Sequence, residues 1–195
     1  PRRVSEREIR DFVAGKTAWL TKYMALVPEK IKFQYVTGEI HHVFGKEYPL
    51  QILLGPRDEA GISSGGELQL VLRTKQSDRE DIFKAGMKRI LLWEIEKQLE
   101  IWTKRMAIPE SRITGVTIRV MKSRWGSCRR VTGRFSFALD LVTKPKECIE
   151  AVVVHELCHL FAAGHGPDFY ARMETYLPDY KERDRLLASL PRELI

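Results

Sequence analysis

The segment from Pro145 to His165 constrains the fold of this 195-residue chain more than any other. Apolar residues fill most positions from 149 to 161, so a helix over them has little polar surface and is expected to be buried. Within it, the sequence His155-Glu156-Leu-Cys-His159 places two histidines four residues apart. Residues at this spacing lie on one face of a helix, about 6 Å apart along the axis. The sequence therefore predicts a buried helix that carries two neighbouring imidazoles.

The ends of this helix are also marked in the sequence. Pro145 fits the first turn, where its missing amide hydrogen costs no hydrogen bond. Gly164 suits a left-handed exit, so we expect the helix to continue through Ala163. If the chain reverses at Gly164, it brings His165 back toward the first two histidines. The sequence thus predicts that three imidazoles surround one point.

Three imidazoles in this arrangement are suited to bind one metal ion. Glu156 follows the first histidine directly, where a carboxylate can take a proton from water at the metal. An open fourth position favours a catalytic centre, because structural sites usually close their shell with another protein ligand, often a thiolate. Cys158 lies about 100° around the helix from His159, so we expect it to face elsewhere. The alternative is a pair of core histidines that bind backbone carbonyls.

The N-terminal part of the chain predicts a helix followed by a β-meander. Ser5 and Glu8 form a capping box that opens the helix, and Pro28 ends it. The glycine-rich segment 55–66 is expected to be an exposed loop. Alternating apolar residues predict strands over residues 31–36, 40–44, 48–54 and 67–73.

The C-terminal part predicts a long helix, a pair of strands and the histidine-bearing helix. Ser77 and Glu80 form a second capping box, and the helix it opens is expected to stop near Pro109. The order of elements lacks alternating strand–helix–strand units and therefore predicts an α+β fold. We expect a first region over residues 1–76 and a metal-binding catalytic region over 77–195, together forming one compact unit. Strands are predicted over 116–121 and 134–139, and short helices over 167–176 and 178–189.

Charge and cysteine content restrict the partners and the compartment. Lys and Arg total 33 against 26 Asp and Glu, and the net charge of +7 favours anionic partners. A basic cluster near Trp125 consists of Lys122, Arg124, Arg129 and Arg130. It suggests a weak contact with nucleic acid or a nucleotide, although solvated surface charge is the simpler interpretation. Three widely spaced cysteines favour reduced thiols in the cytoplasm, and no apolar stretch approaches the roughly 18 residues that span a bilayer.

Several segments together resemble the YgjP-like family of zincin metallopeptidases, which is related to the SprT-like and WLM groups. The most particular is Met121-Lys-Ser-Arg-Trp-Gly-Ser-Cys128, which precedes the H-E-x-x-H motif. Pro145 to Val154 resembles the family's run into that motif, and His165-Gly-Pro-Asp-Phe169 resembles its H-x-x-x-F segment. The hairpin over residues 37–45 is also similar, so the resemblance covers most of residues 5 to 190.

The resemblance implies a zincin-like α+β fold and a cytoplasmic peptidase that cleaves peptide or protein substrates. It implies one zinc ion held by His155, His159 and His165, with Glu156 as general base and acid. The metzincin peptidases share the spacing from the second to the third histidine but carry glycine where this chain has Ala162, so we exclude that branch.

The remaining candidate residues are assigned less directly. Arg124 and Tyr170 are candidates for contact with substrate or for stabilising the transition state. Strand 116–121 precedes the active helix in the order of a zincin edge strand, so a peptide substrate could pair with it; an ordinary core strand is the alternative. Trp125 is expected to pack under the helix. We expect His41 and His42 to be exposed, and Asp168 and Glu174 to lie on helix surfaces.

Two other functions remain open at this point. The basic cluster and the net charge are compatible with a metal-dependent nucleotide phosphohydrolase, although no run of carboxylates offers the Mg²⁺ ligands common in such enzymes. A non-enzymatic module in which zinc only holds the fold is the other alternative, and in it Glu156 would be dispensable. The peptidase is the function that the motifs favour.

Overall fold

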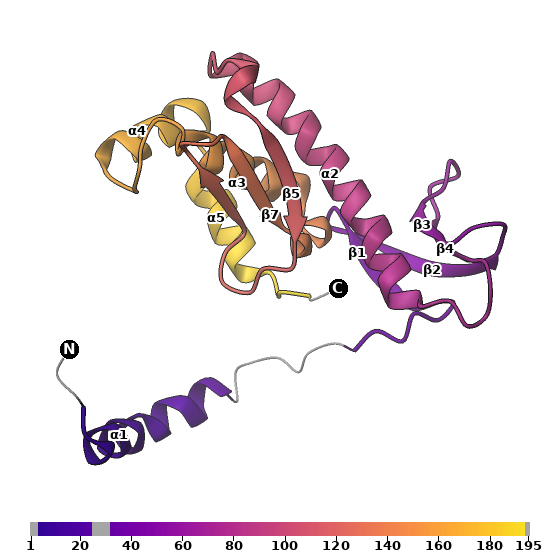
Figure 1. Cartoon of the computed structure of the whole chain (residues 1–195), viewed down its shortest axis with the longest axis horizontal. Coiled ribbons are helices and arrows are strands. Elements are labelled where there is room, and N and C mark those ends of the chain that lie inside the picture. The colour runs from indigo at the N-terminus through magenta and orange to yellow at the C-terminus, as the bar shows by residue number, and fades with distance from the viewer. Residues whose placement is uncertain (1–3, 25–31, 194–195) are drawn as a thin grey trace. The chain divides into compact units, whose positions relative to one another are not determined.

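The computed structural model describes residues 4–24 and 32–193 (Figure 1). The chain divides into two units, residues 1–31 and 32–195. The first unit contains α1 (Glu6–Met24). The predicted capping box is confirmed, because the Ser5 amide donates to Glu8 Oε2 at 2.8 Å and the Glu8 amide donates to Ser5 Oγ at 3.3 Å. The helix end predicted at Pro28 and the strand start predicted at Ile31 lie outside the described residues.

The second unit begins with a four-stranded mixed sheet of order β1-β2-β4-β3. Strands β2 and β4 are parallel, and the outer pairs β1–β2 and β3–β4 are antiparallel. The prediction of an exposed loop over 55–66 is wrong in part, because β3 lies inside it and pairs with β4. The strands are β1 (Ile40–Val43), β2 (Lys46–Leu54), β3 (Glu59–Ile62) and β4 (Leu68–Leu72).

The strand predicted over 31–36 does not form in residues 32–36. The backbone amides of Gln34 and Tyr35 both donate to the Glu39 carboxylate at 2.8 Å, so a side chain takes the place of a neighbouring strand. Tyr35 also adopts a positive φ of 53°, which is incompatible with a strand. The alternation of apolar residues here reflects packing of a folded loop.

The expectation that His41 is exposed is wrong. Its side chain is 3% exposed and lies between the rings of Phe33 and Phe83, with centroid distances of 4.4 and 4.5 Å. Its Nε2 lies 3.0 Å from Glu39 Oε2, and burial holds the pKa of His41 below its ordinary value. His41 is therefore a core residue, whereas His42 is partly exposed.

The long helix α2 (Arg79–Arg105) packs against both sheets and against the histidine-bearing helix (Figure 1). Its cap differs from the predicted Ser77–Glu80 box. Asp78 is the N-cap and accepts from the Asp81 amide at 3.0 Å, while Ser77 Oγ donates to Asp58 at 2.7 Å. The Ser77 hydroxyl also accepts from the Thr74 amide at 3.3 Å, so it belongs to the turn before the helix and does not cap it.

The remaining elements form a second sheet and a group of helices. The short helix η1 (Glu110–Arg112) leads into a three-stranded sheet of order β5-β7-β6, in which β7 is parallel to β5 and antiparallel to β6. Helix α3 packs against α2, α4, α5 and β6. The elements are β5 (Gly115–Arg119), β6 (Gly126–Arg129), β7 (Arg134–Ala138), η2 (Leu139–Thr143), α3 (Lys146–Cys158), α4 (Pro167–Tyr176) and α5 (Tyr180–Ser189).

The predicted α+β fold is therefore confirmed, with two small mixed sheets joined by α2. The sequence did not predict β6 as a strand. The region boundary proposed between residues 76 and 77 stays a prediction; in the second unit, α2 packs on strands from both sides of that boundary.

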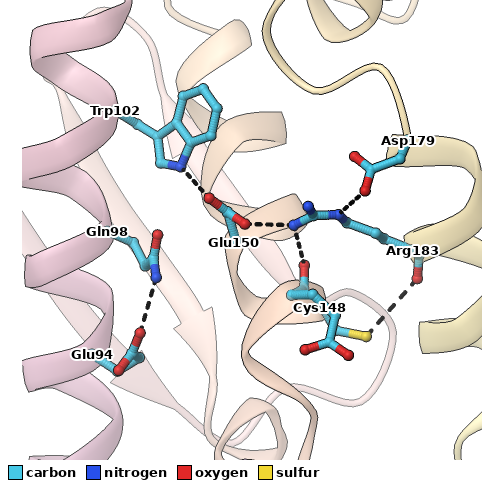
Figure 2. Close-up of polar contacts among 8 residues, drawn as sticks. Glu94, Gln98, Trp102, Cys148, Glu150, Asp179 and Arg183 are labelled. Carbon is cyan, nitrogen blue, oxygen red and sulfur yellow. Dashed lines mark hydrogen bonds and ion pairs between the residues drawn. The ribbon is translucent and has the colours of Figure 1, made fainter.

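A polar network ties α3 to α2 and α5, on either side of it (Figure 2). Glu150 on α3 accepts from Trp102 Nε1 at 3.0 Å and pairs with Arg183 through its second oxygen. Arg183 also binds Asp179 at 2.9 Å. Because these side chains come from α2, from α3 and from the N-terminal end of α5, the network links α3 to both neighbouring helices.

We expect Glu150→Ala to destabilise the fold by about 1–3 kcal/mol, because it leaves the indole N–H of the buried Trp102 unpaired and removes one of the partners of Arg183. For a chain of this length, each kcal/mol corresponds to a fall in Tm of about 2–4 °C. Thermal unfolding followed by circular dichroism measures the change. Glu100→Gln, which removes an exposed pair with Lys104, is the control and should leave Tm unchanged. Equal Tm values for both variants would contradict the prediction.

Candidate metal centre

Three histidines converge at the end of α3. His155 lies in its last turn, His159 is its C-cap, and His165 lies in the loop before α4. Their ligand nitrogens all lie within 4.8 Å of one another, and Nε2 of His155 and His165 are 3.0 Å apart. The ring of Phe169 packs against all three, with centroid distances of 4.7 to 4.8 Å. The convergence predicted from the sequence is thus present.

The route by which the chain reaches this arrangement differs from the prediction. Helix α3 ends at Cys158 instead of continuing through Ala163. The amides of Leu160 and Phe161 donate to the carbonyls of Leu157 and Cys158, each at 3.0 Å, so a tighter turn follows the helix directly. Gly164 does not adopt a positive φ. His165 therefore approaches through an irregular loop instead of a left-handed helix exit.

The surroundings favour the neutral form of two of the imidazoles, those of His155 and His159. Burial lowers the pKa of His155 to about 4, and the neighbouring His159 and His165 add to the effect. Burial also lowers the pKa of His159, whose Nδ1 lies 3.2 Å from the Ala162 carbonyl oxygen. Such a contact with one ring nitrogen orients the imidazole and leaves the other free. Neutral imidazoles with free nitrogens are the form that binds metal ions.

Glu156 lies beside the three histidines and is 5% exposed. Burial raises the pKa of its carboxyl group to about 8, and the charge of Arg124 acts in the opposite direction. Its Oε2 has no hydrogen-bond partner among the residues that the structure describes. A carboxyl group with a raised pKa and a free oxygen is suited to exchange protons near neutral pH.

The site opens into a cavity of about 540 Å³ between α3, α5 and β6. The edge strand that lines this cavity is β6, and β5 lies at the opposite edge of the three-stranded sheet. Strand β5 is thus an edge strand, as the order of elements predicted, but it does not border the cavity, because β7 separates it from β6. The lining includes His155, Glu156, His159, His165, Arg124, Trp125, Gly126, Ser127, Cys128 and Arg130.

Gly126 on β6 is a site residue that sequence reasoning missed. A Cβ atom built on Gly126 would lie 2.5 Å from Oε1 of Glu156 and 2.7 Å from its Cγ. The Glu156 side chain thus occupies the space into which any residue other than glycine at position 126 would place its side chain. The signal in the sequence was the glycine within Arg124-Trp-Gly-Ser-Cys128, but only the pairing of β6 shows what it faces.

The structure also locates the other residues that the sequence singled out near the three histidines. Arg124 lines the cavity, whereas Tyr170 lies on α4 with its ring centroid 6.4 Å from that of His165. Cys158 is buried and does not belong to the histidine cluster, as expected. Trp125 packs on the core and also lines the cavity, with the Arg192 guanidinium 3.9 Å above its ring.

Both acidic residues considered near the cluster are exposed. Asp168 lies in the first turn of α4, and Glu174 pairs with Lys181 at 2.9 Å. The expectation of surface positions for them is confirmed. The three cysteines are free thiols.

The donor set fits a metal ion of the zinc type. The three imidazoles converge, and two of their nitrogens face each other at 3.0 Å, where one hydrogen at most can lie between them. The Oε2 atom of Glu156 is buried and has no hydrogen-bond partner among the described residues, and water held by a bound ion would supply one. Imidazole nitrogens suit zinc and several other transition metals.

This donor set and its neighbouring carboxylate define a candidate metallohydrolase centre. Comparison with family models gives a match to "YgjP-like, metallopeptidase domain" over residues 1–190. The chain therefore belongs to the YgjP-like metallopeptidase family, as the motifs indicated. The comparison with curated proteins returns no match.

Two solved structures are similar over about half of the chain. The metallopeptidase zymogen abylysin of Pyrococcus abyssi matches at 23% identity and a TM-score of 0.44, covering 52% of this chain and 99% of that protein. The zymogen jannalysin of Methanocaldococcus jannaschii matches at 20% identity and a TM-score of 0.43, covering 48% and 93%. Among the described residues, no helix combines the length and the apolar character needed to cross a bilayer.

Proposed function

We propose that the chain is a zinc-dependent peptidase whose zinc ion is held by His155, His159 and His165, with Glu156 as general base and acid. The observation that carries the proposal is the convergence of three imidazole nitrogens within 4.8 Å beside a buried carboxyl group. Membership of a metallopeptidase family supports peptide or protein as the substrate. Three free thiols favour a reducing compartment such as the cytoplasm.

The residues of the chain divide the work of peptide hydrolysis. A zinc ion, when bound, supplies Lewis acidity that polarises a substrate carbonyl and makes water more acidic. Glu156 Oε2, which has no other partner among the described residues, accepts a proton from a water molecule beside it. Because burial favours the protonated form of Glu156, the same group then donates its proton to the leaving amine.

Arg124 and β6 are suited to position the substrate. The Arg124 side chain lines the cavity and supplies positive charge near Glu156, so it is our candidate for stabilising the oxyanion. Tyr170 is a second candidate and is exposed beside His165. The free edge of β6 borders the cavity, and we propose that an extended peptide pairs with this edge.

Removal of the metal tests this function. We expect the purified chain to contain one zinc ion and to cleave unstructured peptides, and His155→Ala to lose both properties. Chelation should abolish cleavage and added zinc should restore it. His42→Ala, which replaces a histidine of β1 outside the cluster, is the matched control and should keep both.

Two outcomes would overturn the proposal. Hydrolysis of nucleoside triphosphates without peptide cleavage would identify a phosphohydrolase at the same centre. Absence of turnover on either substrate, together with a fall in Tm on chelation, would identify zinc as a structural ion. Both measurements use the same preparations of the wild type, His155→Ala and His42→Ala.

A further inference from the structure

The face of the three-stranded sheet that points away from Glu156 carries an unusual set of basic residues. Along β6, Gly126 faces Glu156, and side chains alternate, so Ser127 and Arg129 point to the opposite face. Arg134 on β7 and Arg119 on β5 share that face and are exposed. We call it the basic sheet face; it consists of Thr117, Arg119, Ser127, Arg129, Arg134 and Ser136.

The register arranges these residues in rows across the strands. Arg129 lies directly opposite Arg134, although like charges at opposed positions destabilise a sheet. The next row contains three hydroxyl groups, from Ser127, Ser136 and Thr117, with Thr117 Oγ1 and Ser136 Oγ 2.9 Å apart. Arg119 begins the third row, opposite Ala138. The hydroxyl row is thus flanked by positive charge on both sides.

Nothing in the described part of the chain neutralises this charge. None of Arg119, Arg129 and Arg134 forms an ion pair with a described residue. A hollow of about 600 Å³ lies over these residues, and no acidic side chain is among the described residues that line it. Guanidinium and hydroxyl groups are the donors that bind phosphate oxygens. An anionic ligand would offset the repulsion between these two opposed arginines.

We infer that the basic sheet face binds the phosphodiester backbone of duplex nucleic acid without reading its sequence. The outer rows lie four residues apart along β7, about 13 Å, so a ligand that reaches both must carry several anionic groups. Among the described residues that line the hollow, Phe135 is the one aromatic residue, and it is buried, so none of them offers a ring on which single-stranded bases could stack. The inference does not depend on the proposed peptidase activity.

An acidic peptide fits this face less well. A peptide that pairs with the free edge of β6 would place its side chains next to Arg129 only. Arg134 and Arg119 lie one and two strands further away, at about 4.8 Å per strand. A ligand that lies across the strands contacts all three. The charge therefore favours a polyanion that lies over the sheet.

Salt-dependent binding of a fluorescein-labelled 20-base-pair DNA duplex, measured by anisotropy, tests the inference. Three phosphate contacts predict a slope of about −2.7 in log K against log salt, or about 40-fold weaker binding at 200 mM than at 50 mM salt. Arg119→Gln, Arg129→Gln and Arg134→Gln should each reduce the slope by about 0.9. Arg185→Gln on α5, with the same change of charge, is the matched control and should keep the parent slope.

Folding is checked in the same preparations. Since Arg129 and Arg134 repel each other, replacing either should leave Tm equal or raise it by up to about 4 °C. Parent affinity and slope in the triple variant Arg119→Gln/Arg129→Gln/Arg134→Gln would overturn the inference. A parent chain that binds a polyglutamate peptide through these arginines but does not bind the duplex would also overturn it, and would indicate an acidic protein partner.

Discussion

Replacement of Glu156 by Gln is expected to lower the turnover of peptide substrates by about 10²- to 10⁴-fold, the range that general acid–base groups contribute. The amide has nearly the same shape as the carboxyl group but cannot accept a proton from water. The three imidazoles do not include Glu156, so bound zinc should remain. Steady-state cleavage of a fluorogenic peptide, combined with zinc analysis of the same sample, measures both quantities.

A second glutamate serves as the control for this prediction. Glu174→Gln makes the same chemical change on the exposed side of α4, where Glu174 pairs with Lys181, and should leave turnover unchanged. If Glu156→Gln kept the wild-type turnover, the carboxyl group of Glu156 would not be the general base and acid. Loss of zinc in Glu156→Gln would instead show that the group supports the metal site directly.

Replacement of Gly126 by Ala is expected to lower kcat by about 10²-fold while zinc remains bound. The new Cβ would meet Oε1, Cγ and Cδ of Glu156 at 2.5, 2.7 and 2.9 Å, so the carboxyl group must move. A displacement of about 1 Å at a reacting group can cost about 10²-fold in rate. Gly126 is a positioning residue in this view, because it acts through Glu156 alone.

The control for Gly126→Ala is a glycine in the same sheet. Gly115→Ala on β5 places its Cβ in open space, with no atom within 4 Å, and should keep the wild-type kcat. Overpacking is expected to destabilise Gly126→Ala by about 1–3 kcal/mol, so both variants are assayed well below their Tm. An unchanged kcat with an altered KM would indicate that β6 binds substrate without orienting Glu156.

The composition of the site could be predicted because it depends on local geometry. Spacing of four residues placed His155 and His159 on one face, and a return of the chain was enough to anticipate His165. The residue at which helix α3 ends, and the path of the loop that follows it, could not be predicted. Whether α3 stops at Cys158 or continues through Ala163 depends on packing after the last turn, which helix propensity does not determine. The roles of these residues in catalysis stay predictions.

Features that depend on distant partners were missed or misplaced. The cap of α2 is Asp78 instead of Ser77, whose hydroxyl binds Asp58 from another part of the chain and accepts from the Thr74 amide. Strand β6 has four residues, and its register with β7 determines which of them faces Glu156. Neither the contact nor the register has a local signal in the sequence, so Gly126 could not be assigned in advance.

The antiparallel pairing of β6 and β7 makes the length of their connection critical. Gly133 ends this connection with a φ of 64°, and a Cβ there would lie 2.0 Å from the Arg112 carbonyl oxygen, so this position requires glycine. A shift of β6 by one position against β7 would exchange the two faces of β6. Ser127 would then press on Glu156, and an arginine would turn toward the protein interior. The register between β6 and β7 therefore determines the centre on one side of the sheet and the charged surface on the other side together.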